Sequence, residues 1–503
     1  MNLSQVSKNI AKGGVIVFAG MLISRLLAYL YIALVARLGS SEYGLFSLAI
    51  IIVSFLSIIA TFGFRTGIIR YIAYYKGKKD DKGIKGSIIS SLKVSLPLSI
   101  FLTFILFIFS EKISVLIFHN PDLTPILRII SLSLPFLALS ELFISAITGF
   151  QKIEYKVLIK EIIENTLKLL LTFLVIYFGY KLFGVTVVYV ITMIVSAILS
   201  FYFLQKKIFP FLKTKVIPKP LTKELIVFSL PLIFSSFFTL IVKWTDVLMI
   251  GYFRNASDVG VYNVALPTAN LLTLIPTSMM AIFMPIIMEF YSKKKFKEIK
   301  NISIINSKWI LFLNFPIFLL ILLFSKQILS IMFGSEYIVG SLALTILLFG
   351  YMVRSLTHVN SAILIMLKKT KLLFFSGLIA AIFNIILNYL LIPKFGIIGG
   401  AIATSFSFIV TFLFVFIYSY KLTGIQPIKW NYLKSIIAGI ISFFIVKYIS
   451  GFVDNISFIP FVLFSILFLI IYGLLIYFFK GLNKEDKEII NGFYLKFKNI
   501  KFF

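Results

Sequence analysis

The chain is a series of apolar stretches, fourteen in all, separated by short polar segments. A helix that crosses a bilayer needs about 20 mostly apolar residues, and it satisfies its own backbone hydrogen bonds where no water can. The sequence therefore predicts an all-α integral membrane protein with fourteen transmembrane helices. The first stretch is too long for a cleaved signal peptide. The predicted spans cover residues 14–36, 45–64, 94–109, 124–149, 157–178, 182–204, 225–250, 261–288, 309–324, 341–366, 372–392, 396–420, 432–450 and 456–479.

The composition excludes several other classes of protein. Hydrophobic residues make up 60% of the chain and charged residues 14%, whereas a soluble domain is roughly 45–50% apolar and about 25% charged. The chain has no cysteine, and His119 and His358 are its two histidines. Disulfides, thiol chemistry and a metal centre rich in Cys or His are therefore excluded. We expect no cofactor; a coupling ion, Na⁺ or H⁺, is left open.

The net charge of +30 has two interpretations. Basic chains often bind nucleic acid, but that requires a basic face on a folded soluble domain. Here most Lys and Arg residues fall between apolar stretches. Alternate loops, taken with the N-terminus inside, carry nearly all of the charge, while the other loops sum to about zero. By the positive-inside rule, we expect a multi-pass cell-membrane protein with both termini in the cytoplasm, and no nucleic-acid partner.

An internal repeat predicts the architecture. Residues 39–49 recur as residues 255–265, at an offset of 216. Each copy has an acidic residue (Glu42 or Asp258) and a Gly two positions later (Gly44 or Gly260), followed by an aromatic residue and an Ala. Two weaker matches, at offsets of 215 and 212, relate residues 110–118 to 325–333 and residues 183–185 to 395–397.

Six predicted helices separate the two copies, so both halves have the same orientation. Such parallel repeats, related by an axis along the membrane normal, are typical of transporters with a central cavity. We expect a six-helix lobe at residues 1–212, a second lobe at residues 213–424, and two further helices with a cytoplasmic tail at residues 425–503.

Two segments resemble a known superfamily. Ser24-Arg25, Val35–Gly39 and Glu42–Phe46 resemble the start of polysaccharide flippases in the multidrug/oligosaccharidyl-lipid/polysaccharide exporter superfamily, and Ile392–Thr404 resembles a later segment of the same proteins. The resemblance covers essentially the whole chain. It implies translocation of an oligosaccharide linked to polyprenyl phosphate or pyrophosphate, from the inner to the outer leaflet.

One departure bears on the substrate. Lipid II flippases, which belong to the same superfamily, carry a similar Ser-Arg that is followed six residues later by an Arg-Asp pair; this chain has Tyr31-Ile32 there. A surface-glycan or glycoprotein-oligosaccharide role is therefore favoured over a peptidoglycan precursor. The multidrug branch normally has twelve spans, so the added pair also favours the glycan branch.

Ionisable side chains deep in a span are functional candidates, because they are costly unless they face protein or a wet cavity. Arg25 lies about twelve residues into the first span, and its guanidinium could pair with phosphate oxygens. Arg354 and His358 are one turn apart in the tenth span and share a face. We expect all three to bind substrate in a shared cavity. The alternatives are that Arg25 bonds the carbonyls of a neighbouring helix, that the charge of Arg354 is satisfied within its lobe, and that His358 is a hydrogen-bonded packing residue.

Carboxylates are the candidates for ion coupling. Asp246, expected to pair with Lys243, could take a proton or Na⁺ when that pair opens. Glu141 is expected to be unpaired and is a second proton-site candidate. Glu164 and Lys168, four residues apart, are expected to form an ion pair.

The leading hypothesis is a flippase for a lipid-linked oligosaccharide or polysaccharide precursor that works by alternating access. The alternative is a cation-coupled multidrug or metabolite exporter. A membrane glycan polymerase or transferase would need large outer loops with catalytic residues, and the loops here are short, so we expect no enzyme. Glycosyltransferases are the expected functional partners of a monomeric protein.

Overall fold

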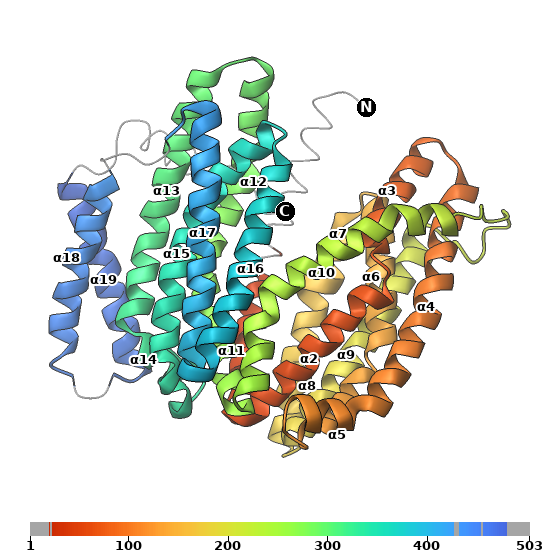
Figure 1. Cartoon of the computed structure of the whole chain (residues 1–503), viewed down its shortest axis with the longest axis horizontal. Coiled ribbons are helices and arrows are strands. Elements are labelled where there is room, and N and C mark those ends of the chain that lie inside the picture. The colour runs from red at the N-terminus through yellow and green to blue at the C-terminus, as the bar shows by residue number, and fades with distance from the viewer. Residues whose placement is uncertain (1–19, 21–22, 427–431, 454–455, 480–503) are drawn as a thin grey trace. The chain divides into compact units, whose positions relative to one another are not determined.

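The computed structural model describes residues 20, 23–426, 432–453 and 456–479. Helices occupy most of these residues, and none of them forms a β-strand (Figure 1). The expectation of an all-α protein is therefore confirmed. The predicted tail and most of the segment before the first helix lie outside the described residues, and the cytoplasmic placement of both termini stays a prediction.

Ten helices are long and apolar enough to cross a membrane, or up to eleven if a bent pair counts as one span, among the residues searched. The bent pair is α5 (Leu123–Ser131) with α6 (Leu134–Gly149), which meet at 42°. These eleven fall on eleven of the predicted spans. The molecule is a multi-pass membrane protein.

The other three predicted spans are not among the helices counted. The span at 14–36 is only partly described, as a helix over Ile23–Ala36. The span at 157–178 carries four charged side chains. The span at 225–250 lies within α10 (Thr222–Phe253), which is long enough to cross a bilayer but is not among the ten helices counted. The count of fourteen stays a prediction.

The described chain divides into two compact units, residues 1–267 with 381–404, and residues 268–380 with 405–503. The predicted lobes and C-terminal pair stay predictions. Besides Ile23–Ala36 and α10, the first unit contains α2 (Ser40–Ala60), α3 (Phe64–Gly77), α4 (Asp81–Lys112), η1 (Ile113–Ile117), α5, α6, α7 (Ile153–Lys156), η2 (Val157–Ile163), α8 (Glu164–Tyr177), α9 (Lys181–Phe203), η3 (Leu204–Ile208), most of α11 (Ala256–Asn270), and parts of α16 (Thr370–Phe395) and α17 (Ile397–Thr423).

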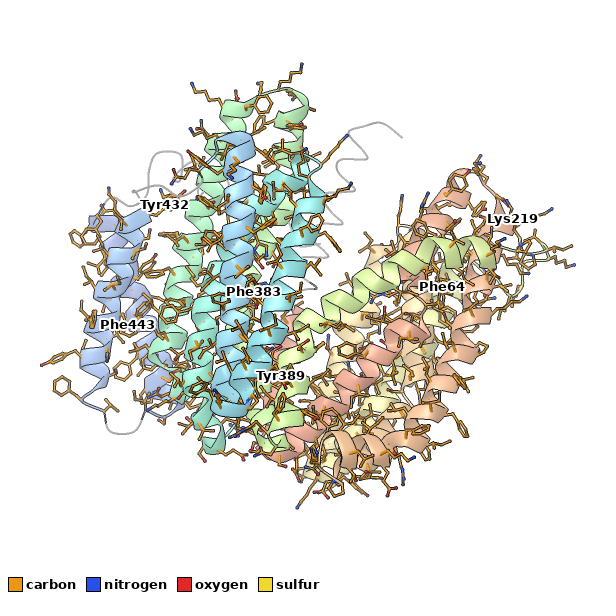
Figure 2. The ribbon with its side chains drawn as sticks, in the orientation of Figure 1. Phe64, Lys219, Phe383, Tyr389, Tyr432 and Phe443 are labelled. Carbon is orange, nitrogen blue, oxygen red and sulfur yellow. The ribbon has the colours of Figure 1, made fainter. Side chains whose placement is uncertain are left out.

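Helix α6 lies at the centre of the first unit and packs against α3, α4 and α9. Phe64 and Ile68 on α3, Leu142 on α6 and Leu204 on η3 belong to the same buried apolar cluster. Figure 2 labels Phe64 within this unit. Other large apolar side chains stay exposed, such as Phe383 at 42% and Tyr389 at 63%, as suits helices whose outer faces meet lipid.

The two copies of the sequence repeat meet within the first unit. The Ser40 and Ser257 hydroxyls are 2.8 Å apart. A Cβ on Gly44 would lie 1.7 Å from the Ala256 carbonyl oxygen, and a Cβ on Gly260 would lie 1.9 Å from the Ser40 carbonyl oxygen. Gly44 and Gly260, and likewise Ser40 and Ala256, are equivalent positions of the repeat, 216 residues apart. The two close approaches between α2 and α11 are therefore related by an approximate local two-fold axis. Only glycine permits this approach.

The second unit is a helical bundle. Its elements are the end of α11, η4 (Leu271–Thr273), α12 (Leu274–Ser292), α13 (Phe296–Leu323), α14 (Ser325–Met332), η5 (Ser335–Gly340), α15 (Ser341–Met366), the remaining parts of α16 and α17, α18 (Leu433–Ser450) and α19 (Phe458–Phe478). Helix α13 packs against α12, α15 and α18. The hydroxyl of Tyr432, labelled in Figure 2, donates to the Ile304 carbonyl at 2.7 Å and ties the start of α18 to α13.

Candidate functional site

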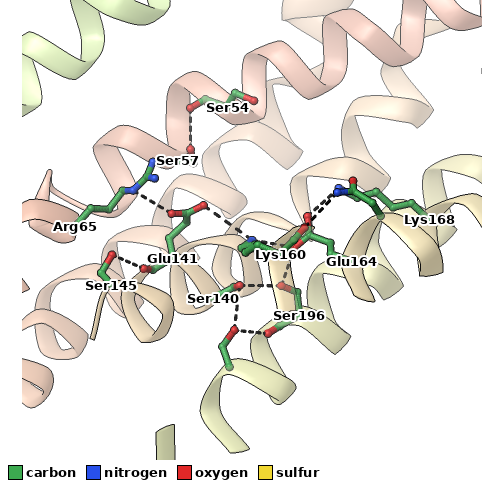
Figure 3. Close-up of polar contacts among 12 residues, drawn as sticks. Ser54, Ser57, Arg65, Ser140, Glu141, Ser145, Lys160, Glu164, Lys168 and Ser196 are labelled. Atoms are coloured by element: carbon green, nitrogen blue, oxygen red, sulfur yellow. Dashed lines mark hydrogen bonds and ion pairs between the residues drawn. The ribbon is translucent and has the colours of Figure 1, made fainter. Parts of the chain in front are cut away.

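Five charged side chains form a continuous column inside the first unit (Figure 3). Arg65 Nε lies 3.0 Å from Glu141 Oε2, and Lys160 Nζ lies 3.9 Å from Glu141 Oε1. Lys160 Nζ also lies 2.9 Å from Glu164 Oε2, and Lys168 Nζ lies 2.8 Å from Glu164 Oε1. We call Arg65, Glu141, Lys160, Glu164 and Lys168 the charged column.

Three separate elements supply these residues. Arg65 is in the first turn of α3, and Glu141 is on α6. Lys160, Glu164 and Lys168 recur every four residues along η2 and α8, so they occupy one face of a continuous helical segment. The π-helical turn η2 precedes Glu164; such turns are frequent at functional sites.

Serine side chains complete the polar surroundings of Glu164. Ser196 Oγ on α9 donates to Glu164 Oε2 at 2.7 Å. Ser140 Oγ on α6 lies 2.9 Å from Ser196 Oγ and 3.5 Å from Ser200 Oγ. Small hydroxyl residues let the helices approach closely and satisfy polar groups away from water. The predicted Glu164–Lys168 ion pair is confirmed, within a larger network than the sequence indicated.

Arg25 lies on the helix Ile23–Ala36, which is tied to this column. The Asn165 side-chain amide donates to Ser24 Oγ at 3.0 Å and to the carbonyl oxygens of Lys160 and Glu161. Ser24 is buried and Arg25 is partly buried, and Arg25 interacts electrostatically with Glu161. The hydrogen bond from Asn165 to Ser24 therefore holds Arg25 beside the start of α8, which begins at Glu164.

The expectation that Glu141 is unpaired is wrong. Its carboxylate contacts Arg65 and Lys160. Arg65 follows directly after the second predicted span, so the sequence assigned it to a cytoplasmic loop. Its contact with Glu141 depends on how α3 packs against α6, and nothing in the local pattern shows this. The proposed coupling role of Glu141 stays a prediction.

Asp246 is at the centre of a second polar cluster, also in the first unit. Its Oδ2 accepts hydrogen bonds from the Tyr262 hydroxyl at 2.6 Å and from Thr404 Oγ1 at 2.7 Å. Asn384 Nδ2 lies 3.3 Å from Thr404 Oγ1, and Asn388 Nδ2 donates to Asn384 Oδ1 at 3.0 Å. All five side chains are buried. We call them the Asp246 cluster.

Two oxygens of the Asp246 cluster, Asp246 Oδ1 and Asn388 Oδ1, are buried without a hydrogen-bond partner among the described residues. A buried acceptor of this kind costs free energy unless a proton or cation satisfies it. The expected partner of Asp246, Lys243, is exposed, with its Nζ 4.5 Å from the ring centroid of Trp244. The partners found for Asp246 are thus hydroxyl donors on α11 and α17.

Arg354 and His358 lie on α15 in the second unit. Arg354 is exposed, and its guanidinium carbon lies 4.5 Å from the ring centroid of Phe408 and 5.7 Å from that of Tyr351. His358 Nδ1 lies 3.2 Å from the Arg354 carbonyl oxygen. Arg354 and His358 are in a different unit from Arg25, so the expected shared cavity stays a prediction.

The charged column, the Asp246 cluster and Arg354 could bind different kinds of ligand. The charged column offers cations that are already paired with carboxylates, and Arg354 offers an exposed cation on an aromatic support. The Asp246 cluster offers hard oxygen ligands, which suit Na⁺ or a proton. No group of three or more His, Asp or Glu residues gathers as a metal site among the described residues.

The fold and these polar sites within the helices define a membrane transporter. Residues 10–291, more than half of the chain, match the sequence profile of the polysaccharide biosynthesis protein family, and residues 231–390 match the MatE profile. The chain belongs to the polysaccharide biosynthesis protein family, in the flippase branch of the multidrug/oligosaccharidyl-lipid/polysaccharide exporter superfamily.

Two relatives and one solved structure are similar to the chain. An uncharacterized membrane protein of Methanocaldococcus jannaschii is 29% identical over 484 residues, covering 92% of this chain and 94% of the relative. A protein of Haloferax volcanii named "probable low-salt glycan biosynthesis flippase" is 30% identical over 190 residues, covering 38% of this chain and 40% of the relative. The fold is similar to the lipid II flippase MurJ in an inward closed conformation, with a TM-score of 0.72 and 21% identity over 92% of this chain and 98% of that structure.

Proposed function

We propose that this protein flips an oligosaccharide or polysaccharide precursor, linked to polyprenyl phosphate or pyrophosphate, from the inner to the outer leaflet by alternating access. Family membership supports the glycan class of substrate. The observation that carries the proposal is Arg25, a partly buried cation on the apolar helix Ile23–Ala36 whose neighbour Ser24 accepts a hydrogen bond from Asn165. Its nearby carboxylate is Glu161, and an anionic headgroup is the ligand that its guanidinium would pair with bidentately.

During transport the phosphate of the substrate would be bound by Arg25. The polyprenyl tail stays in lipid, so only the headgroup requires a polar path. In the second unit, Arg354 and His358 are proposed to meet the headgroup later in the cycle. Arg354 is exposed and held on Phe408 and Tyr351, which keeps its guanidinium edge free to donate hydrogen bonds.

Coupling to an ion is proposed at the Asp246 cluster. Asp246 Oδ1 and Asn388 Oδ1 are the unsatisfied oxygens that Na⁺ would bind, and Asp246 is the group that H⁺ would bind, with Thr404 and Tyr262 orienting the carboxylate. The supporting observation is that five buried polar side chains, three of them amide or carboxyl groups, gather within apolar helices. The MatE match makes a cation-coupled drug or metabolite exporter the second candidate function.

The test of the proposal uses Arg25. Replacement by Ala should abolish flipping while the protein still inserts, because the guanidinium serves the substrate more than the fold. Replacement by Lys should restore part of the activity, since Lys keeps the charge but loses the bidentate fork. A charge-assisted hydrogen bond contributes roughly 1.5–3 kcal/mol, which is about ten- to a hundredfold in affinity.

The measurement is the appearance of labelled lipid-linked glycan in the outer leaflet of reconstituted vesicles, with equal amounts of protein. Arg70→Ala is the matched control: Arg70 is an arginine of the same unit, over the ring of Phe228 at 4.5 Å. Normal flipping by Arg25→Ala would make Arg25 structural. We propose further that the protein acts as a monomer and receives its substrate from glycosyltransferases.

A further inference from the structure

The charged column does not balance its charges. Arg65, Lys160 and Lys168 are three cations, and Glu141 and Glu164 are two carboxylates. The column therefore carries one more cation than carboxylate, although each cation contacts a carboxylate. This surplus positive charge favours the approach of an anion.

The column is exposed at Arg65 and largely buried along the rest of its length. The Arg65 side chain is 61% exposed, Glu141 22%, Lys160 16%, Glu164 9% and Lys168 15%. An anion can therefore reach Arg65 first and Lys160 next, whereas Glu164 is enclosed by Lys160, Lys168 and Ser196. Arg65 also follows directly after the predicted inner end of the second span, where a substrate of the inner leaflet would arrive.

Of the two carboxylates, Glu141 is held less tightly. Lys160 Nζ is 2.9 Å from Glu164 but 3.9 Å from Glu141, so its close contact is with Glu164. The close partner of Glu141 is Arg65, at 3.0 Å, which lies at the exposed end. A Glu164 carboxylate with three donors is fixed, whereas Glu141 can move away at the cost of one close contact.

We propose that Arg65 and Lys160 form an entry site for the phosphate of the substrate, and that the Glu141 carboxylate occupies this site when substrate is absent. The proposal rests on the flippase function proposed above and adds the residues that first receive the headgroup. A carboxylate and a phosphate present similar oxygen pairs to a guanidinium. A phosphodiester equals the carboxylate in unesterified oxygens and in charge, and a pyrophosphate exceeds it in both, so the headgroup displaces Glu141 and neutralises the surplus cation.

The exchange gives the headgroup a route toward Arg25. From Lys160 to Lys168 the helix rises about 12 Å at 1.5 Å per residue. Asn165 lies between these two lysines in the sequence and donates a hydrogen bond to Ser24. Arg25, the next residue after Ser24, therefore lies at a height between the two lysines along the helix. A phosphate released from Arg65 and Lys160 would then have Arg25 within about one turn of α8 in level, on the neighbouring face that carries Glu161 and Asn165.

The experiment measures binding of a radiolabelled short-chain polyprenyl phosphate to the full-length protein in lipid nanodiscs, with the same polyprenol lacking phosphate as reference. Arg65→Gln and Lys160→Gln should each weaken binding about tenfold or more, as expected for loss of a charge-assisted contact. Glu141→Gln should tighten binding by about tenfold, because the competing carboxylate is gone. If the charged column served stability alone, removing the charge of Glu141 would not make the protein bind polyprenyl phosphate more tightly.

Two variants serve as matched controls. Arg70→Gln removes another cation from α3, and Glu111→Gln removes the carboxylate of the exposed pair with Arg128; both should bind as the wild type does. If Arg65→Gln does not fold, Arg65→Lys replaces it, with weaker binding expected from loss of the planar fork.

The outcomes separate the two proposals. The exchange would be overturned if the Arg65, Lys160 and Glu141 variants all bound polyprenyl phosphate as the wild type does. It would also be overturned if Glu141→Gln bound it more weakly. Either result would leave the proposed flippase function unaffected. If the wild type binds polyprenol as well as it binds polyprenyl phosphate, the proposed function itself fails, and the entry site fails with it.

Discussion

At the scale of single residues, Glu164 is the side chain on which the charged column depends. Its two oxygens accept from Lys160, Lys168 and Ser196. We predict that Glu164→Gln lowers stability by about 3–5 kcal/mol, because two enclosed ammonium groups lose their counter-charge. Thermal unfolding of the purified protein measures this.

The exposed ion pair between Arg128 and Glu111, at 3.4 Å, provides the control for Glu164. Their side chains are 43% and 70% exposed, so Glu111→Gln should cost no more than about 1 kcal/mol. If the two variants unfold at the same temperature, the column does not stabilise the first unit.

Asp246 belongs to the same scale. Asp246→Asn keeps an oxygen to accept from Tyr262 and Thr404 but removes the charge, so we predict a folded protein whose transport no longer responds to Na⁺ or to a proton gradient. Transport is measured against Na⁺ concentration at constant ionic strength, and separately against pH. Tyr262→Phe, which removes one donor and leaves the carboxylate, should retain the response. An unchanged ion response of Asp246→Asn would assign coupling elsewhere.

The sequence predicted contacts within an element better than contacts between elements. Glu164 and Lys168 were identified because four residues make one helical turn. The partner of Asp246, Thr404, is 158 residues away, and the partner of Glu141, Arg65, was assigned to a loop. Asn384 and Asn388, four residues apart in an apolar span, were the available signal for the Asp246 cluster.

At the scale of elements, the sequence repeat did not predict the contact between α2 and α11. The repeat identified Gly44 and Gly260 as equivalent, but not that their helices touch. Because the chain has no cysteine, Ser40→Cys with Ser257→Cys creates the only thiol pair. The hydroxyls are 2.8 Å apart, and we predict that mild oxidation joins the thiols in high yield.

A glycine substitution tests whether this cross-link reports close packing. Adding Gly44→Ala to the cysteine pair should sharply lower the yield, since a Cβ would lie 1.7 Å from the Ala256 carbonyl oxygen. Gly77→Ala is the control, because a Cβ there meets nothing within 4 Å. Cross-linking is followed by gel mobility. Equal yields from both glycine variants would contradict the α2–α11 contact.

At the scale of the whole molecule, hydropathy and the positive-inside pattern predicted a multi-pass all-α membrane protein, which is confirmed. Hydropathy predicted this because the bilayer permits little besides apolar helices. The exact number of spans depends on segments such as 157–178, where charged side chains reduce the apolar signal. The same charges that make the span hard to recognise by hydropathy form most of the charged column.

The measurement that tests the central claim most directly compares two substrates in vesicles containing the wild-type protein. One is an oligosaccharide on polyprenyl phosphate, and the other is the same oligosaccharide joined to the polyprenol by a neutral ether. If cations within the membrane recognise the phosphate, the protein should flip the phosphate-linked form at least about tenfold faster, the effect of one charge-assisted contact. Equal rates for the two forms, each above protein-free vesicles, would contradict the claim.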